Sequence, residues 1–289
     1  MISPLSPKES LRGWGEFNNS MPLKSIILGG GDLATGVALR LFRAGCVVII
    51  TELPQPYAVR RSVSFAQAVY DGQIIIEELT GSLFQDMNAI PQGSELNIVP
   101  ILIDPDALCI KDFLPDVIID ARMTKMANKN RFYPAIYTIG LGPGFIVGEN
   151  CHAVIETQRG HFMGRAYFSG SAEKDTGIPD RVANFQRERV LRSPAAGVFS
   201  TKAVIGQQFD EGEEIARIGQ SIIVAPFKGI LRGLLHDGLP VNPGIKIGDI
   251  DPRADQRLCE LVSDKALAVG GGVLEAVLIQ PEFRQKFYG

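Results

Sequence analysis

The sequence predicts an α/β protein that begins with a doubly wound parallel sheet and continues with a small β-rich module and C-terminal helices. Two observations support this class. Over the first half of the chain, short apolar runs alternate with helix-like segments, as in parallel strands joined by right-handed crossovers. Between residues 193 and 251, a pattern of prolines and glycines recurs at an offset of 32 residues, which indicates a β unit that is present twice.

The first predicted unit is a strand, a glycine loop and a helix over residues 24–45. An apolar run is followed by three glycines, and apolar residues at helical spacing then continue to a terminating Gly45. The loop fits G-x-G-x-x-A, in which the glycines allow a tight turn and the approach of a pyrophosphate to bare backbone. Free N–H groups at the helix start attract the anion. The expected cofactor-binding residues here are Gly29, Gly30, Gly31, Asp32, Leu33 and Ala34.

A second apolar run, residues 46–51, ends in Glu52. An acid at about this distance after the glycine loop is typical of one that hydrogen-bonds a ribose hydroxyl, and it would repel a 2′-phosphate. The pattern therefore predicts a Rossmann-like domain and favours NAD over NADP. Asp32 fits less well, because a carboxylate beside a phosphate is unfavourable unless it points away or meets a cation or a hydroxyl. A nucleotide-type fold whose loop binds no ligand stays open as an alternative.

The rest of this domain is predicted to contain a helix over residues 57–70 and further strands. Arg60, near the start of that helix, either reaches a phosphate or carboxylate at the sheet edge or lies on a solvated face. Pro100 predicts an edge or interrupted strand. Ligands of open parallel sheets bind at the carboxyl ends of strands, which points to residues 120–122 and to a second glycine-rich turn. The further strands are residues 74–76, 98–103, 117–119 and 137–139, and the second turn contains Gly142 and Gly144.

A polar connection between two short predicted strands, residues 153–157 and 165–169, gathers Glu156, Arg159 and His161. A carboxylate, an anion binder and a titratable imidazole are the groups that acid–base catalysis uses, so these three are the catalytic candidates. The alternative is a polar hairpin tip with an ion pair.

The repeated β unit contains two copies of P-x-x-G-hydrophobic, which start at Pro194 and Pro226, and each copy is followed by two glycine turns. This spacing resembles the biotinyl/lipoyl barrel-sandwich hybrid. In carrier domains of that type, a lysine on the hairpin between the halves accepts the cofactor, and residues 217–223 contain none. Neither biotin nor lipoate is therefore expected. In the last segment, three glycines from Gly270 predict a break between two packed helices.

These observations divide the chain into five predicted parts. Residues 1–20 form a poorly ordered leader, and a connecting β segment separates the nucleotide-binding domain from the repeat module. The other boundaries place the nucleotide-binding domain at 21–148, the connecting segment at 149–192, the repeat module at 193–251 and the C-terminal helices at 252–289.

Composition and charge argue against several classes of function. The formal net charge is −3 and there is no basic block, so a nucleic-acid partner is not expected. The apolar runs are far shorter than the ~20 residues of a membrane span. The cysteines are widely spaced and no histidine pair accompanies them, which argues against a metal site and a disulfide framework and favours the cytoplasm. The four cysteines are Cys46, Cys109, Cys151 and Cys259.

Several long motifs together resemble the YqeB family, the accessory proteins of selenium-dependent molybdenum hydroxylase systems. That family is similar in turn to the maturation proteins of xanthine and carbon monoxide dehydrogenases. The resemblance implies a cytoplasmic bacterial protein with a Rossmann-like domain that helps to mature a molybdenum cofactor for a client hydroxylase. The motifs are GGGDLATGVA, VRRSVSFAQAVYDG, IGLGPGF, VIETQRGHFMGR, KIGDIDPR and SDKALAVGGGVLEAVL.

Two functions follow as expectations. In the first, a maturation protein holds an NAD(P)-type dinucleotide or a molybdopterin dinucleotide at the glycine loop. In the second, an NAD-dependent oxidoreductase uses Glu52 on the ribose and His161 or Arg159 at the substrate. Because no well-positioned acid–base pair is evident, a binding protein is favoured over a turnover enzyme. Whether copies of the chain assemble with one another stays open.

Overall fold

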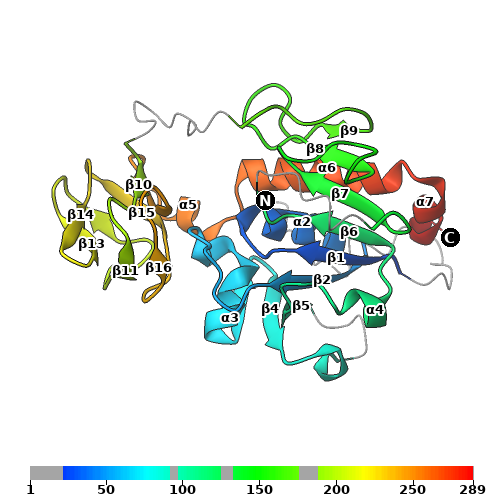
Figure 1. Cartoon of the computed structure of the whole chain (residues 1–289), viewed down its shortest axis with the longest axis horizontal. Helices are drawn as coiled ribbons and strands as arrows, with labels where there is room; N and C mark the ends of the chain where they lie inside the picture. Colours follow the sequence, from blue (N-terminus) through cyan, green and yellow to red (C-terminus); the bar gives the residue numbers. More distant parts are fainter. Residues whose placement is uncertain (1–21, 92–96, 125–132, 176–187, 289) are drawn as a thin grey trace, which may run out of the picture.

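The computed structural model describes residues 22–91, 97–124, 133–175 and 188–288. The predicted leader, residues 1–20, lies outside this part of the chain. Figure 1 shows a large sheet flanked by helices and, beside it, a smaller all-β module. No helix in the described residues combines the length and the apolar character that a membrane crossing requires.

The large sheet has nine strands in the order β3-β4-β5-β2-β1-β6-β7-β8-β9. Neighbours from β4 to β8 are parallel, whereas β3 and β9 pair antiparallel at the two edges. The strands are β1 (Lys24–Leu28), β2 (Val47–Glu52), β3 (Gln73–Ile76), β4 (Leu79–Phe84), β5 (Ile98–Ile103), β6 (Val117–Asp120), β7 (Tyr137–Leu141), β8 (Ala153–Ile155) and β9 (Ala166–Tyr167).

The expected class, a doubly wound parallel sheet, is corrected to a mixed sheet. Two hairpins supply the antiparallel edge strands: β4, which was not predicted, pairs with β3, and β9, which lies within the predicted strand over residues 165–169, pairs with β8. Among the described crossovers, only that between β1 and β2 contains a long helix, α2 (Asp32–Arg43). The predicted boundary at residue 148 falls inside this sheet, because β8 continues it beside β7.

The predicted helix over residues 57–70 does not form. Two 3₁₀ turns, η1 (Arg61–Val63) and η2 (Phe65–Gln67), and one turn of helix, α3 (Ala68–Asp71), take its place. The Phe65 N–H donates to Thr35 Oγ1 at 3.0 Å, and the Ala66 N–H donates to the Gly30 carbonyl at 2.8 Å. These N–H groups bond to the glycine loop and α2, so the segment cannot complete a continuous helical ladder.

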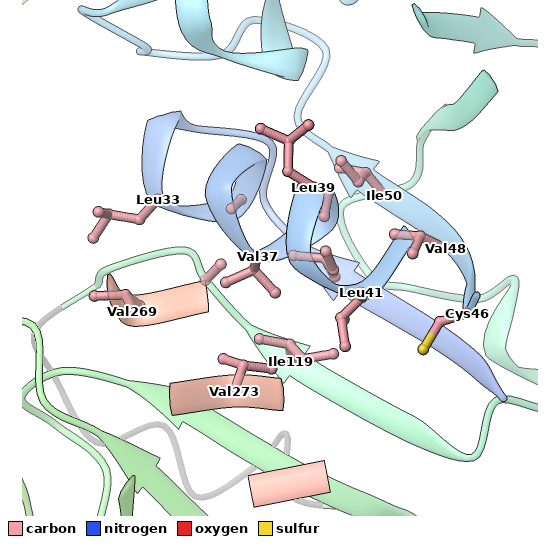
Figure 2. Close-up of a cluster of buried hydrophobic side chains, with 14 of the residues drawn as sticks. Leu33, Val37, Leu39, Leu41, Cys46, Val48, Ile50, Ile119, Val269 and Val273 are labelled. Carbon is pink, nitrogen blue, oxygen red and sulfur yellow. The ribbon is translucent and has the colours of Figure 1, made fainter. Parts of the chain in front are cut away.

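The C-terminal part contains α5 (Arg257–Glu260), α6 (Asp264–Leu278) and α7 (Pro281–Tyr288). The predicted break at the triple glycine is wrong, because α6 runs through it without interruption. A Cβ at Gly270 would lie 2.5 Å from the Gly36 carbonyl oxygen of α2, so the missing side chain allows the two helices to pack closely. Figure 2 shows Val37 of α2 and Val273 of α6 within the resulting apolar cluster.

The opposite face of the sheet has its own core. Ile27 of β1 lies in the cluster with α2 and α6, whereas its neighbour Ile26 packs with Phe113 of α4 (Ile110–Phe113). This alternation follows from the period of two along a strand. The sheet is therefore a buried middle layer.

Pro100 does not mark an edge strand, because β5 lies between β4 and β2. Pairing of β5 with β2 begins only at Ile101, one residue after the proline. Pro100 lies outside the stretch of β5 that pairs with β2, so its missing N–H removes no hydrogen bond between these two strands.

The all-β module consists of two four-stranded antiparallel sheets, β10-β17-β15-β12 and β14-β13-β11-β16. The predicted class, a biotinyl/lipoyl barrel-sandwich hybrid, is corrected to this pair of sheets. The strands are β10 (Val190–Arg192), β11 (Gly197–Ser200), β12 (Gln208–Phe209), β13 (Glu214–Ile218), β14 (Ser221–Val224), β15 (Gly229–Leu234), β16 (Pro240–Val241) and β17 (Lys246–Asp251).

The offset of 32 residues relates β10–β13 to β14–β17 strand by strand, so the repeat starts one strand before the predicted residue 193. Each sheet contains strands from both copies of the repeat. β12 of the first copy pairs with β15 of the second copy, and β16 of the second copy pairs with β11 of the first copy. One apolar core lies between the sheets. Neither half could bury its apolar face alone.

The segment 57–67, here called the connector, joins the large sheet to the module. The Tyr57 hydroxyl donates to the Pro240 carbonyl at 2.6 Å, and Arg61 Nε donates to the Leu234 carbonyl at 2.7 Å. The Ser62 hydroxyl donates to the Cys259 carbonyl at 2.5 Å, beside α5. Because the same segment bonds to the glycine loop, the loop and the module are connected by continuous hydrogen-bonded structure.

Candidate functional site

A cavity of about 540 Å³ opens beside the glycine loop. Its lining comes from the carboxyl ends of β1, β2 and β6 and from the connector, which is where open parallel sheets bind ligands. The lining residues are Leu28, Gly29, Gly31, Asp32, Thr51, Glu52, Leu53, Tyr57, Ala58, Val59, Arg60, Ser64, Pro105, Ala121, Arg122, Met123 and Thr124.

Each glycine of the loop has a different role. Gly29 has φ +88°, a backbone conformation that side chains disfavour, and its N–H donates to the Thr51 carbonyl at 2.8 Å. A Cβ at Gly30 would lie 2.8 Å from the Ala66 nitrogen, so this glycine allows the connector to approach. A Cβ at Gly31 would meet no atom within 4 Å. Gly31 therefore leaves open the part of the cavity beside the start of α2.

Gly31 is also the N-cap residue of α2, and no side chain caps this helix end. The first N–H groups of a helix lack partners within the helix and carry partial positive charge, so they suit an anion. The predicted binding residues Leu33 and Ala34 are buried in the first turn, where their side chains pack in the core. Their contribution to a site is restricted to backbone N–H groups.

Glu52 is bound to the glycine loop. Its Oε2 accepts the Gly30 N–H at 2.6 Å, and its Oε1 accepts the Leu53 N–H at 2.7 Å. Burial raises the pKa of Glu52, and these two backbone bonds act in the opposite direction by favouring the carboxylate. Each carboxylate oxygen can accept a further bond, so Glu52 can also receive a hydroxyl donor from the cavity.

Arg60 is 8 % exposed and lines the cavity, so of the two alternatives for this residue the solvated helix face is wrong. Its Nη2 donates to the Leu258 carbonyl at 2.9 Å, and its Nη1 lies 3.9 Å from Asp32 Oδ2. Burial lowers the pKa of Arg60, and the nearby Asp32 charge partly offsets this. Its Nε is buried without a hydrogen-bond partner. The cavity therefore has a buried guanidinium with an unused donor.

The residues that follow β6 also line the cavity. This agrees with the prediction that a ligand site includes residues 120–122. Arg122 lines the cavity and forms a bidentate ion pair with Asp120, in which Nε donates to Oδ1 at 2.9 Å. The second glycine turn lies behind this wall, because a Cβ at Gly142 would lie 3.4 Å from Met123 Cε and 2.4 Å from Thr157 Oγ1. The cavity lining includes neither Gly142 nor Gly144.

The structure does not assemble Glu156, Arg159 and His161 into one site. Glu156 is fully buried, and its carboxylate accepts the N–H groups of Gln158 at 2.6 Å and Glu173 at 2.7 Å. Arg159 forms a bidentate pair with Asp264 at the start of α6. His161 is exposed and contacts the ring of Phe162 edge-on. Because the imidazole lies in solvent and the carboxylate is buried, the two groups cannot share a proton directly.

The cysteines do not provide a reactive centre. All four are free and buried, and burial raises the pKa of the Cys46, Cys109 and Cys151 thiols to about 12. Burial also raises the pKa of Cys259. A thiol in such surroundings is a poor nucleophile. No cluster of three or more histidine, cysteine or acidic residues suited to a metal ion occurs in the described part of the chain.

Sequence reasoning missed the lining residues Tyr57, Ser64 and Met123. The first two lie on the connector, whose apolar spacing imitates a helix, so no local pattern places them at the loop. Met123 has φ +54° and lies three residues after Asp120, the last residue of β6. The one usable signal was its position next to a strand end.

Together, the fold and the cavity define an α/β protein with an open cavity at the carboxyl ends of parallel strands. Among curated proteins, the chain is 44% identical over 254 residues to the uncharacterized protein YqeB of Escherichia coli (strain K12). The match covers 88% of this chain and 47% of that protein, so the chain spans about half the length of this relative. This supports the resemblance to YqeB that the motifs indicate. No protein-family model matches the sequence.

Several solved structures are similar to this chain at low sequence identity and low TM-score. A succinylglutamate desuccinylase from Silicibacter sp. TM1040 is 14% identical with TM-score 0.23, over 80% of this chain and 85% of that one. The apo ectoine utilization protein EutE (DoeB) from Ruegeria pomeroyi is 10% identical with TM-score 0.23, over 79% and 86%. A succinylglutamate desuccinylase/aspartoacylase from Rhodobacter sphaeroides is 13% identical with TM-score 0.24, over 81% and 86%.

These comparisons correct the functional expectations. The similar structures are named as desuccinylase- and aspartoacylase-type proteins, and the sequence relative is uncharacterized. The expected role in molybdenum hydroxylase maturation, with its selenium chemistry and its relation to xanthine and carbon monoxide dehydrogenases, is therefore withdrawn. The alternative of an NAD-dependent oxidoreductase is withdrawn with it. At TM-scores of 0.23 and 0.24, the activities named for those structures are not transferred to this chain.

Proposed function

We propose that this chain binds a nucleotide of the NAD type in the cavity beside the glycine loop. The diphosphate lies at the start of α2, and a ribose hydroxyl donates to Glu52. The observation that carries this proposal is the combination at Gly31 of an uncapped helix N-terminus and open space where a side chain would be. Backbone N–H groups that face open space can bond to phosphate oxygens without any change in the fold.

Glu52 supports a preference for a ligand with a free 2′-hydroxyl. Its carboxylate is fixed by the Gly30 and Leu53 N–H groups, so it cannot swing away from a ligand without losing two hydrogen bonds. A fixed negative charge repels a 2′-phosphate and accepts a hydroxyl. NAD and ADP-ribose therefore fit the site better than NADP.

Calorimetric titration of the full chain with NAD, ADP-ribose and NADP tests the proposal. We expect saturable binding of NAD and ADP-ribose with one site per chain and weaker binding of NADP. If none of the three ligands binds at millimolar concentration, the chain does not have this function.

Replacement of the Glu52 carboxylate tests the source of the preference. Glu52→Gln removes the negative charge and keeps an acceptor for one backbone N–H, so we expect NADP affinity to rise about 10-fold and NAD affinity to fall a few-fold. The matched control is Glu78→Gln, since Glu78 pairs with Arg43 on the surface outside the cavity. An unchanged NAD-to-NADP ratio in Glu52→Gln would place the ribose elsewhere.

A further inference from the structure

The unused donor of Arg60 requires an explanation, because buried polar atoms are almost always hydrogen-bonded. Arg60 is held in place: Nη2 bonds to the Leu258 carbonyl at 2.9 Å, and the Arg60 carbonyl accepts the Ser64 hydroxyl at 2.8 Å. Its Nε nevertheless has no partner although the residue lines the cavity. A guanidinium fixed by protein atoms with one donor left over is suited to an additional anionic partner.

Asp32 is the carboxylate nearest to this guanidinium, and their interaction is weak. The distance from Asp32 Oδ2 to Arg60 Nη1 is 3.9 Å, and the Asp32 side chain is 38 % exposed. Asp32 does not cap α2, where Gly31 is the N-cap residue and no side-chain cap bond forms. Since one long ion pair holds it, the Asp32 side chain can rotate into solvent at small cost.

Cations of the module surround the same region. Asp249 is buried and bonds to both Arg189 and Arg232, and Asp251 is held by Arg253. The module's buried carboxylates are thus already paired within the module. Among the described residues, Asp32, at 3.9 Å, provides the one carboxylate within 4.0 Å of the Arg60 guanidinium.

We propose that Arg60 of the connector forms a subsite for a phosphate group, and that Asp32 occupies this subsite in the ligand-free protein. A phosphate at the start of α2 displaces the Asp32 carboxylate and bonds to the Arg60 guanidinium. The inference rests on the proposed nucleotide function in that the phosphate belongs to the same ligand. It adds a contribution of the connector to binding and explains the acidic residue in the glycine loop.

Inorganic pyrophosphate tests the subsite without a nucleoside. We expect Arg60→Gln to weaken pyrophosphate binding about 30-fold, because a charge-assisted bond and a buried charge are lost. Asp32→Asn should strengthen it about 10-fold, since the competing carboxylate is removed. Adenosine, which has no phosphate, should bind all variants equally.

Arg61→Gln is the matched control. Arg61 also donates to the module, at the Leu234 carbonyl, but it does not line the cavity. Thermal melting of each variant checks that it is folded. If Arg61→Gln weakens pyrophosphate binding as much as Arg60→Gln does, the effect is structural and the subsite is refuted.

The remaining outcomes separate the two proposals. Unchanged or weaker pyrophosphate binding in Asp32→Asn overturns the subsite even if NAD binds. Pyrophosphate binding that depends on Arg60, with no binding of NAD or ADP-ribose, upholds the subsite and overturns the nucleotide function. If the wild-type chain binds neither pyrophosphate nor NAD, both proposals are wrong.

Discussion

Gly31→Val is expected to abolish NAD and ADP-ribose binding, with a loss in affinity of at least about 100-fold, while the protein stays folded. The added side chain projects from the N-cap position into the space that the diphosphate needs. Within the protein it meets no atom within 4 Å of its Cβ, and the backbone of Gly31 has φ −65°, which suits any residue. Titration calorimetry measures the affinity, and chemical denaturation measures the free energy of unfolding.

The stability cost of this change should stay below about 1 kcal/mol, which is the usual effect of an unfavourable N-cap residue. Gly271→Ala is the control, because a Cβ at Gly271 also meets no atom within 4 Å but lies in α6, outside the cavity lining. It should bind NAD as the wild type does. Undiminished NAD binding by a folded Gly31→Val protein would show that the ligand does not use this loop.

Gly270→Ala is expected to destabilise the protein by about 3 kcal/mol, at the upper end of what an added methyl group costs in a packed core. The new Cβ would lie 2.5 Å from the Gly36 carbonyl oxygen and 2.9 Å from Arg40 Cγ. The first of these atoms is helix backbone, which cannot move aside without separating α2 from α6. Denaturant midpoints of the variant and the wild type provide the measurement.

The neighbouring glycine makes the comparison specific. Gly271→Ala adds the same methyl group to the same helix where there is open space, and it should stabilise the protein by about 0.5–1 kcal/mol because alanine has the higher helix propensity. Equal stabilities of Gly270→Ala and Gly271→Ala would contradict the close approach of the two helices.

The sequence predicted the fold best where local pattern and long-range structure agree. β1, the glycine loop, α2 and β2 lie where apolar spacing and glycines place them, with α2 ending at Arg43 just before Gly45. The predicted helix over residues 57–70 failed because the connector's N–H groups bond to Gly30 and Thr35, which are far away in the sequence. The break at Gly270 failed because glycine in a helix interior also serves close helix packing, which a single sequence does not distinguish from a hinge.

The sequence predicted only some of the residues that line the cavity. The glycine loop and Glu52 follow from short motifs, and the structure places both at the cavity. Arg60 was identified, but its burial depends on the module, whose position no local pattern encodes. Glu156, Arg159 and His161 lie close in sequence, yet the turn sends their side chains into core, ion pair and solvent respectively.

A crystal structure of the full chain with ADP-ribose tests the central claim most directly. We expect the diphosphate at the start of α2 beside Gly31 and a ribose hydroxyl within hydrogen-bond distance of Glu52. The Asp32 side chain should have turned away from Arg60. ADP-ribose bound at another place, or a cavity that stays free of ligand at saturating concentration, would contradict the nucleotide-binding function.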